Sequence, residues 1–168
     1  SALEPFPGAL LWDVGAGSGS IGIEWMRMDH RCQAIAIEAN PERAENITQN
    51  SCKLGTPNLK IVIDKAPSIL STLPTPDAIF IGGGITSKGM VKQCWDFLRA
   101  GGCLVANVVT TEGEEEVLKN QKKLGGHLTR ISISNLEKIG SKKAWRPSMQ
   151  VTQWKVKKPI QMLRESII

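Results

Sequence analysis

The sequence lacks three features that would each have suggested a class of protein. No apolar run approaches the roughly 20 residues that a helix needs to cross a bilayer. No two cysteines form a Cys-x-x-Cys pair, and His30 and His127 are far apart, so we expect no metal site and free, buried thiols. The start shows no basic-then-apolar signal segment, so we expect a cytoplasmic protein. The opening Ser1–Gly8 is compatible with a fragment or an engineered start.

Composition is that of an ordinary globular domain, but charge is unevenly distributed. The chain has 168 residues, 41% of them hydrophobic, and we expect residues 1–168 to form one domain. Residues 1–116 carry 9 Lys/Arg and 14 Asp/Glu, whereas residues 117–168 carry 12 Lys/Arg and 2 Asp/Glu. The basic last third is either a solvated surface or the site of a polyanionic partner, such as a multiply carboxylated metabolite or nucleic acid.

Apolar runs and helical patterns alternate along most of the chain. Each helix follows a strand, as in a parallel sheet with crossover helices. The predicted strands are 10–14, 33–37, 59–63, 77–81 and 103–109, and the main predicted helices begin at 21, 41, 89 and 112. A short helix is expected after Pro67, and Asn40 is expected to cap the helix that Pro41 begins.

The pattern changes near the carboxyl end. Residues 127–136 and 150–156 alternate between apolar and polar side chains, which predicts two half-exposed strands. We interpret the basic, polar stretch 137–149 as a link between them. With no helix between them, the two strands should pair antiparallel. We therefore predict an α/β fold with a mostly parallel, Rossmann-like sheet of seven strands ending in an antiparallel hairpin. This is the architecture of class I S-adenosylmethionine-dependent methyltransferases.

A glycine-rich loop follows the first strand. Gly17, Gly19 and Gly22 satisfy the G-x-G-x-x-G spacing of dinucleotide binders, while Asp13-x-Gly15-x-Gly17-x-Gly19 resembles motif I of the class I methyltransferases. An acid at the strand end suits a cationic sulfonium and would repel a pyrophosphate, which favours S-adenosylmethionine. The third interpretation of this loop is a tight turn that binds no ligand. Ser20 is expected to cap the next helix. The candidate cofactor residues in this loop are Asp13, Gly15, Ala16, Gly17, Ser18 and Gly19.

Other candidate residues lie at the ends of the next strands, where open α/β sheets bind ligands. Glu38 ends the second strand and could accept the hydroxyls of a ribose. Asp64 ends the third strand and could contact an adenine or cap the following helix. The glycines that start at Gly82 leave room for close approach to backbone. Asn107, in the fifth strand, is a candidate for holding a substrate carboxyl or amide.

Longer segments resemble one family, the decarboxylating precorrin methyltransferases of cobalamin biosynthesis. The resemblance covers residues 9–156, and its segments are LLWDVGAGSGSIGIEWMR, AIEANPERAENITQN, DKAPSIL, FIGGG, LVANVVTTE and WRPSMQVTQW. It implies transfer of a methyl group from S-adenosylmethionine to a ring carbon of a tetrapyrrole, coupled to loss of an acetate carboxyl as carbon dioxide. It also implies a homo-oligomer, commonly a tetramer.

The resemblance also assigns residues. Gly15–Gly19 should bind the methionine and ribose portion, Glu38 the ribose hydroxyls and Ala66 the adenine. The family usually has Gly-Asp-Ala-Pro after the third strand, so Lys65 occupies the slot of the adenine-facing acid here. No general base is identified.

Substrate contacts are expected from the basic carboxyl-terminal third. Lys142, Lys143 and Arg146 could bind the carboxylates of a precorrin, and Trp145 could pack on the macrocycle or in the core. The alternatives are an RNA methyltransferase and a degenerate fold that serves as a scaffold. The partly apolar face expected to support an oligomer consists of Leu128, Ile131, Ile133, Val151 and Trp154.

Overall fold

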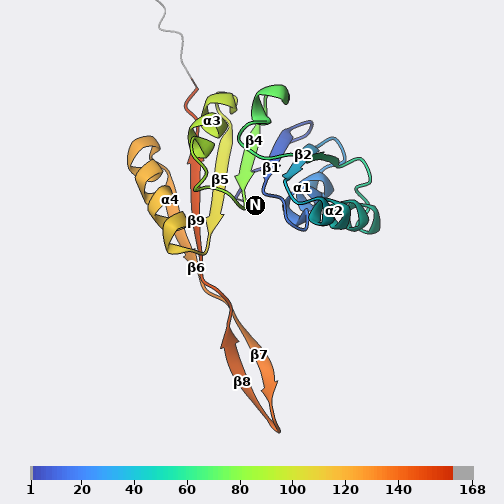
Figure 1. Cartoon of the computed structure of the whole chain (residues 1–168), viewed down its shortest axis with the longest axis vertical. Helices are drawn as coiled ribbons and strands as arrows, with labels where there is room; N and C mark the ends of the chain where they lie inside the picture. Colours follow the sequence, from blue (N-terminus) through green and yellow to red (C-terminus); the bar gives the residue numbers. More distant parts are fainter. Residues whose placement is uncertain (1, 161–168) are drawn as a thin grey trace, which may run out of the picture.

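The computed structural model describes residues 2–160. They form an α/β domain with a long two-stranded extension (Figure 1). The elements are β1 (Leu10–Val14), α1 (Ser20–Met28), β2 (Gln33–Glu38), α2 (Pro41–Lys53), β3 (Lys60–Ile63), a 3₁₀ turn η1 (Leu70–Thr72), β4 (Ala78–Ile81), α3 (Met90–Phe97), β5 (Cys103–Val108), α4 (Thr111–Leu124), β6 (His127–Ile131), β7 (Ser134–Ile139), β8 (Lys142–Pro147) and β9 (Val151–Lys157).

The main sheet has seven strands in the order β3-β2-β1-β4-β5-β9-β6, which confirms the predicted architecture. Strands β1 to β5 run parallel, and β9 lies antiparallel between β5 and β6. The direction in which successive strands are added reverses between β1 and β4. Strands β2 and β3 lie on one side of β1, whereas β4 and β5 lie on the other side. Open α/β sheets bind ligands at such a reversal, beyond the carboxyl ends of the strands.

Each face of the sheet has its own core, because alternate residues of a strand point to opposite faces. Trp12 and Val14 of β1 belong to the core that includes buried residues of α3 and α4. Leu11 of β1 belongs to the other core, which includes Ile23 of α1 and Ile47 of α2. Both faces of the central parallel strands β1, β2, β4 and β5 are therefore covered, and a ligand reaches these strands at their ends.

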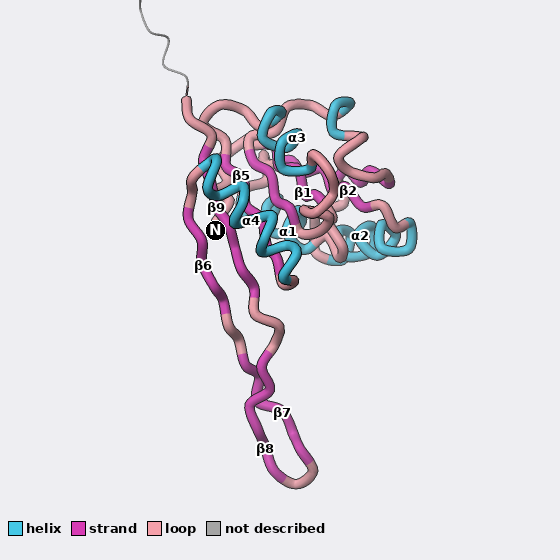
Figure 2. Tube along the Cα trace, turned by 60° about the vertical axis from the view of Figure 1, so that its left-hand side comes forward, coloured by secondary structure: helices cyan, strands magenta, loops and turns pink. Residues whose placement is uncertain are grey.

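The stretch 137–149, which we interpreted as a link, instead contains the end of β7 and all of β8, which form a second sheet. β7 and β8 pair antiparallel, with Lys138 opposite Lys143, and form a ribbon that continues the β6–β9 pair away from the domain (Figure 2). Hydrogen bonds between the two strands continue where the two pairs meet: Ser148 N–H donates to Ile133 O at 2.9 Å, and the Gln150 amide donates to Ser132 Oγ at 2.5 Å. Because β6 is parallel to β5, the β7–β8 ribbon projects from the edge at which the parallel strands end.

Local details differ from the sequence-based predictions at three places. Gly19, with φ +78°, precedes α1 as its N-cap, so Ser20 is the first helical residue and not the cap. The short helix expected after Pro67 is the 3₁₀ turn η1. Among the four free cysteines, only Cys52 is exposed, so the expectation of burial holds for the other three. Within the described residues, no helix is long and apolar enough to cross a membrane.

Candidate functional site

A cavity of about 370 Å³ lies at the carboxyl ends of β1, β2, β3 and β4, where the strand order reverses. Its walls combine bare backbone, one buried carboxylate and apolar side chains. The predicted cofactor residues that line it are Gly15, Gly17, Glu38, Asp64, Lys65, Ala66 and Gly82. The remaining lining residues are Val14, Ile37, Ala39, Arg43, Gly83, Gly84, Ser87 and Met90.

Two glycine segments meet at the base of this cavity. Gly15 adopts φ +69°, and a Cβ atom placed on it would lie 2.8 Å from both the Cα and the N of Gly83. A Cβ atom on Gly82 would lie 3.2 Å from the carbonyl oxygen of Gly15. The glycines after β4, expected to admit a ligand, thus also allow the loops after β1 and β4 to touch.

Glu38 is the buried carboxylate of the cavity, with 6% of its surface exposed. Its Oε2 accepts a hydrogen bond from Gly17 N–H at 2.9 Å, and its Oε1 accepts one from Asn40 N–H at 3.0 Å. Asn40 in turn caps α2 through its side chain, as predicted. The carboxylate therefore ties the glycine loop to the start of α2, and each oxygen keeps a lone pair for a further donor.

Asp13 does not line the cavity, because its side chain turns into the protein below the loop. It is 1% exposed, and its Oδ2 accepts a hydrogen bond from Gly22 N–H of α1 at 2.9 Å. Burial raises the pKa of Asp13 to about 6; the Gly22 N–H lowers that pKa and the nearby Glu38 carboxylate raises it. The structure thus gives Asp13 a supporting position beneath the loop.

The segment after β3 forms the exposed side of the cavity. Asp64 Oδ1 accepts a hydrogen bond from Lys65 N–H at 2.6 Å. The alternative role considered for Asp64, capping a helix, is wrong, because η1 begins at Leu70 and has no side-chain cap. Lys65 and Ala66 also line a second, adjoining cavity of about 470 Å³ together with Ser87 and Lys88. The two cavities share Lys65, Ala66 and Ser87.

Three residues of the predicted loop lie outside the cavity. Ala16, Ser18 and Gly19 are absent from its lining, although they complete the turn that presents Gly15 and Gly17. Conversely, three residues line the cavity that the sequence patterns did not identify as candidates. They are Arg43 in α2, Ser87 in the loop before α3, and Met90 in α3. Arg43 lies within the family-like segment AIEANPERAENITQN, which is the one clue to it.

The candidate substrate residues do not line the cavity. Asn107 lies near the carboxyl end of β5 and its Oδ1 accepts a hydrogen bond from Gln153 of β9 at 2.9 Å. Lys142, Lys143 and Arg146 lie on the β7–β8 ribbon, where Arg146 forms an ion pair with Glu137 at 3.3 Å. Trp145 is 70% exposed, so it is not a core residue of this chain.

Comparison with known proteins agrees with this arrangement. The model of the precorrin methyltransferase domain family matches residues 1–158. The chain belongs to this family. A precorrin-6Y C(5,15)-methyltransferase [decarboxylating] of a Sinorhizobium species is 51% identical over 92% of the chain, and one of Mycobacterium tuberculosis is 42% identical over 94%.

The family fold is also found among solved structures. The C-terminal domain of precorrin-6Y C5,15-methyltransferase from Rhodobacter capsulatus is 39% identical, with a TM-score of 0.85 over 94% of this chain and 84% of that one. An O-methyltransferase from Streptomyces achromogenes in complex with S-adenosylmethionine, 17% identical, shares the fold with a TM-score of 0.64, covering 89% of this chain and 73% of that one. The chain spans 37% and 40% of the length of the two curated relatives.

Proposed function

We propose that the chain is an S-adenosylmethionine-dependent C-methyltransferase that methylates a precorrin and promotes loss of an acetate carboxyl as carbon dioxide. The observation that carries this proposal is the cavity itself, in which Glu38 faces the glycine backbone at the strand-order reversal. A ribose needs a hydrogen-bond acceptor, and the rest of the cofactor needs close approach to backbone and an apolar wall. The residues present supply all three.

The residues of this chain would act mainly by binding and orientation. Glu38 would accept the ribose hydroxyls, the backbone of Gly15–Gly19 and Gly82 would surround the methionine portion, and Asp64–Ala66 would flank the adenine. The buried carboxylates Asp13 and Glu38 favour a cationic ligand. Bound S-adenosylmethionine supplies an electrophilic methyl group. Alignment of a nucleophilic ring carbon with that group can contribute roughly 7–11 kcal/mol to catalysis.

We propose that the polycarboxylate substrate is held at the same edge of the sheet, with help from the β7–β8 ribbon. Several cations of the last third are engaged within the chain: Arg130 pairs with Glu114, while Lys155 and Lys157 pair with Glu4. Within residues 2–160, Lys142 and Lys143 form no ion pair, so we propose that they bind carboxylates. Asn107 lies at this edge and is the candidate for a substrate carboxyl or amide.

Cofactor binding is the first test. Isothermal titration with S-adenosylhomocysteine should show saturable binding, and Glu38→Ala should weaken it by ~1–3 kcal/mol, since a hydrogen-bonding charged group is lost. Glu45→Ala, on the exposed side of α2, is the matched control and should bind normally. Binding of NAD with no response to S-adenosylhomocysteine would refute the proposal, as would equal affinities of the Glu38 and Glu45 variants.

Substrate class needs a separate test. Turnover of a precorrin by the full-length protein, seen as a gain of one methyl group with loss of carbon dioxide, would support the proposal and dismiss a scaffold role. The exposed lysines of the ribbon, Lys142 and Lys143, favour RNA as the second candidate substrate. Tight RNA binding with a steep dependence on salt would favour that candidate over the tetrapyrrole.

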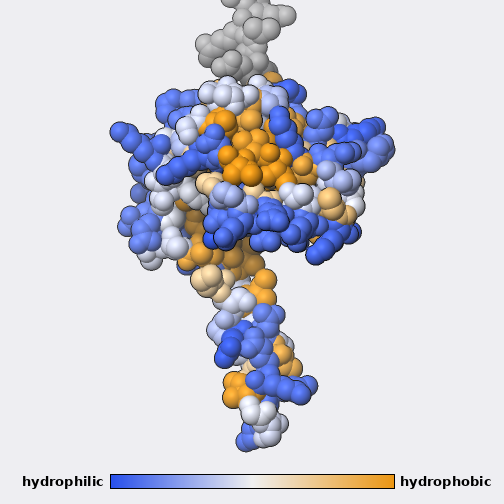
Figure 3. All heavy atoms as spheres, turned by 45° about the vertical axis from the view of Figure 1, so that its right-hand side comes forward, coloured by the Kyte–Doolittle hydropathy of each residue, from blue (hydrophilic) through white to orange (hydrophobic). Residues whose placement is uncertain are grey.

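We also propose that the chain forms a homo-oligomer, and a tetramer in particular, through the β7–β8 ribbon. A lone two-stranded ribbon is marginal in water, and this one exposes apolar side chains among its charges (Figure 3). Leu136, Ile139 and Trp145 lie in the ribbon, and Ile133 and Met149 lie next to its base. Of the apolar face expected from the sequence, Trp154 is fully buried within this chain and unavailable to a partner.

Light scattering tests this assembly. The wild-type chain should have a mass about four times its 18.3 kDa, and a double variant Leu136→Ser/Trp145→Ser should be a monomer. Leu118→Ser, an exposed apolar position on α4, is the control and should leave the mass unchanged. A wild-type monomer at tens of micromolar would contradict the proposal.

We propose finally that the chain acts as a single domain in the cytoplasm. Leu3 packs in the same core as Ile23, while Trp154 and Val156 of β9 pack in the other core, so the first and last described segments contribute to one fold. The free thiols fit a reducing compartment. Fractionation of the source cells would check the location.

A further inference from the structure

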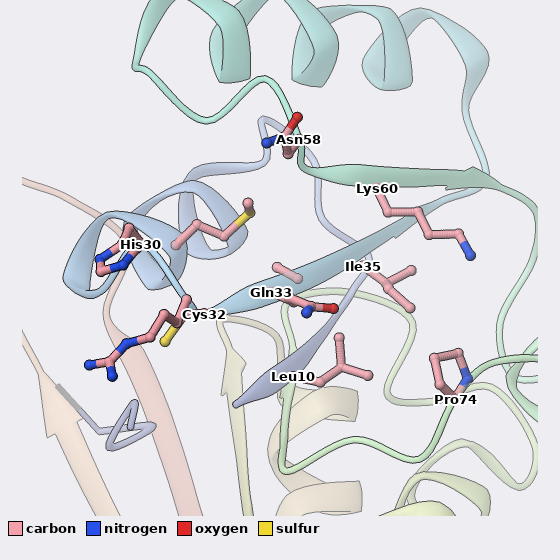
Figure 4. A pocket seen from close by; sticks show the side chains of 11 residues that line it. Leu10, His30, Cys32, Gln33, Ile35, Asn58, Lys60 and Pro74 are labelled. Carbon is pink, nitrogen blue, oxygen red and sulfur yellow. The ribbon is translucent and has the colours of Figure 1, made fainter. Parts of the chain in front are cut away.

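A separate cavity, of about 640 Å³, lies at the opposite edge of the sheet from the cofactor cavity. It opens at the amino ends of β1, β2 and β3, where Leu10, Gln33 and Lys60 begin these strands (Figure 4). Its volume lies within the ~300–1,000 Å³ range of small-molecule sites. The cavity therefore has the size of a binding site, and its lining decides what it could hold.

The lining combines apolar side chains with a basic and amide rim. The apolar lining residues are Leu10, Met26, Ala34, Ile35 and Pro74. Leu10 and Ile35 pack in the same core, and Lys60 lies opposite Ile35 in the neighbouring strand. In Figure 4, Gln33 and Leu10 lie between His30 on one side and Lys60 on the other. No carboxylate lines the cavity. An apolar surface next to cations and amides, without an acid, suits a ligand with an apolar body and a negative charge.

The cations of the rim differ in their availability. Arg31 donates two hydrogen bonds to the Asp29 carboxylate, at 3.0 Å and 2.8 Å, so its charge is already balanced. His30 lies 3.9 Å from the same carboxylate. Lys60 forms no ion pair or side-chain hydrogen bond within residues 2–160, and its flexible stem can bring the ammonium group over the cavity. Lys60 is thus the group that would receive a ligand's charge.

We propose that this cavity is a second ligand site, which binds a small carboxylate with an apolar body, its carboxylate at Lys60 and its body over Leu10 and Ile35. The ammonium group and the Gln33 and Asn58 amides would replace the water around the carboxylate, while the apolar part leaves solvent. The site shares no lining residue with the cofactor cavity. It is independent of the methyl-transfer proposal.

The probe for the test is 2-naphthoate, with neutral 2-naphthylmethanol as its uncharged analogue. In a titration of the 15N-labelled chain followed by NMR, 2-naphthoate should cause saturable shifts at the amides of Gln33, Ala34 and Lys60. Lys60→Glu and Lys60→Met should weaken binding about tenfold or more, and so should removal of the ligand charge, since each removes a charge-assisted hydrogen bond. Lys53→Glu, on α2 outside the cavity, is the matched control.

Each outcome decides the proposal. Saturable shifts confined to these strand starts, with loss of affinity in both Lys60 variants and unchanged affinity for S-adenosylhomocysteine, would support it. The unchanged second affinity shows that the variants are folded. No saturable shift at millimolar probe, shifts on the ribbon instead, or Lys60 variants that bind like the Lys53 variant would overturn it. In the last case Lys60 would serve only to protect an edge strand.

Discussion

Gly15→Ala tests the contact between the loops after β1 and β4. At this position the new methyl group meets Gly83 Cα and N at 2.8 Å, well inside the ~3.5–4.0 Å of a favourable carbon contact. The neighbouring atoms belong to backbone, so no side chain can rotate away. The two loops must separate, and the base of the cofactor cavity must open.

The magnitude follows from comparison with a glycine in the same loop. Gly17 has φ +59° against +69° at Gly15, so alanine at either position bears a similar left-handed strain of about 1–2 kcal/mol. A Cβ atom on Gly17 would meet nothing within 4 Å, whereas overpacking of the kind seen at Gly15 costs a further ~1–3 kcal/mol. Gly15→Ala should therefore lower the free energy of unfolding by ~1–3 kcal/mol more than Gly17→Ala.

Urea unfolding, monitored by tryptophan fluorescence, measures the difference in unfolding free energy between the two variants. The fluorescence reports on unfolding because Trp12 and Trp25 are buried in the two cores. Gly55→Ala, at an exposed turn with φ +81° and open space, gives the cost of strain alone outside the site. Gly15→Ala should also weaken S-adenosylhomocysteine binding at least about tenfold. Equal unfolding free energies for the Gly15 and Gly17 variants would refute the reasoning, since the clash would then have no energetic consequence.

Two further predictions concern stability. Burial raises the pKa of Asp13 from 3.8 to about 6, so the folded state binds the proton more tightly and loses up to ~3 kcal/mol of stability as pH rises from 4 to 7. Asp13→Asn should lack this loss, and parallel pH profiles in chemical denaturation would contradict it. Lys158 donates to the carbonyls of Trp95, Asp96 and Leu98 at 2.6, 3.1 and 2.7 Å. Lys158→Met should lower Tm and cost ~1–3 kcal/mol, whereas the surface control Lys157→Met should cost under ~1 kcal/mol.

Strands β1, β2, β4 and β5 of the main sheet could be predicted from the sequence because they are buried on both faces. Continuous apolar runs mark β1 and β2, and the Asn40–Pro41 pair marks the start of α2 to the residue. Strand topology then brings Gly15, Glu38 and Gly82 to one edge without further information. These parts depend on local patterns and on a rule of sheet geometry.

The β7–β8 ribbon could not be predicted in the same way. Nearly every residue of these strands is exposed, so no alternation of burial marks them, and cross-strand pairing alone defines their register. The predicted exposure of Trp154 is wrong for the opposite reason. The alternating sequence of β9 suggested a half-exposed strand, but α4 covers Trp154, and the indole N–H of Trp154 donates to Gly125 O at 2.9 Å. Arg43 and Met90 reach the cavity from helices, whose rotation about their axes only packing determines.

Glu38 also has a consequence for the thermodynamics of ligand capture. A free glutamate side chain samples many rotamers, and restricting it costs up to ~1.5–2 kcal/mol of entropy. Here the Gly17 and Asn40 amides already restrain the side chain, so this loss of rotational freedom occurs when the chain folds. A ligand hydroxyl therefore meets an acceptor that is already in position, and its binding bears none of that entropy loss.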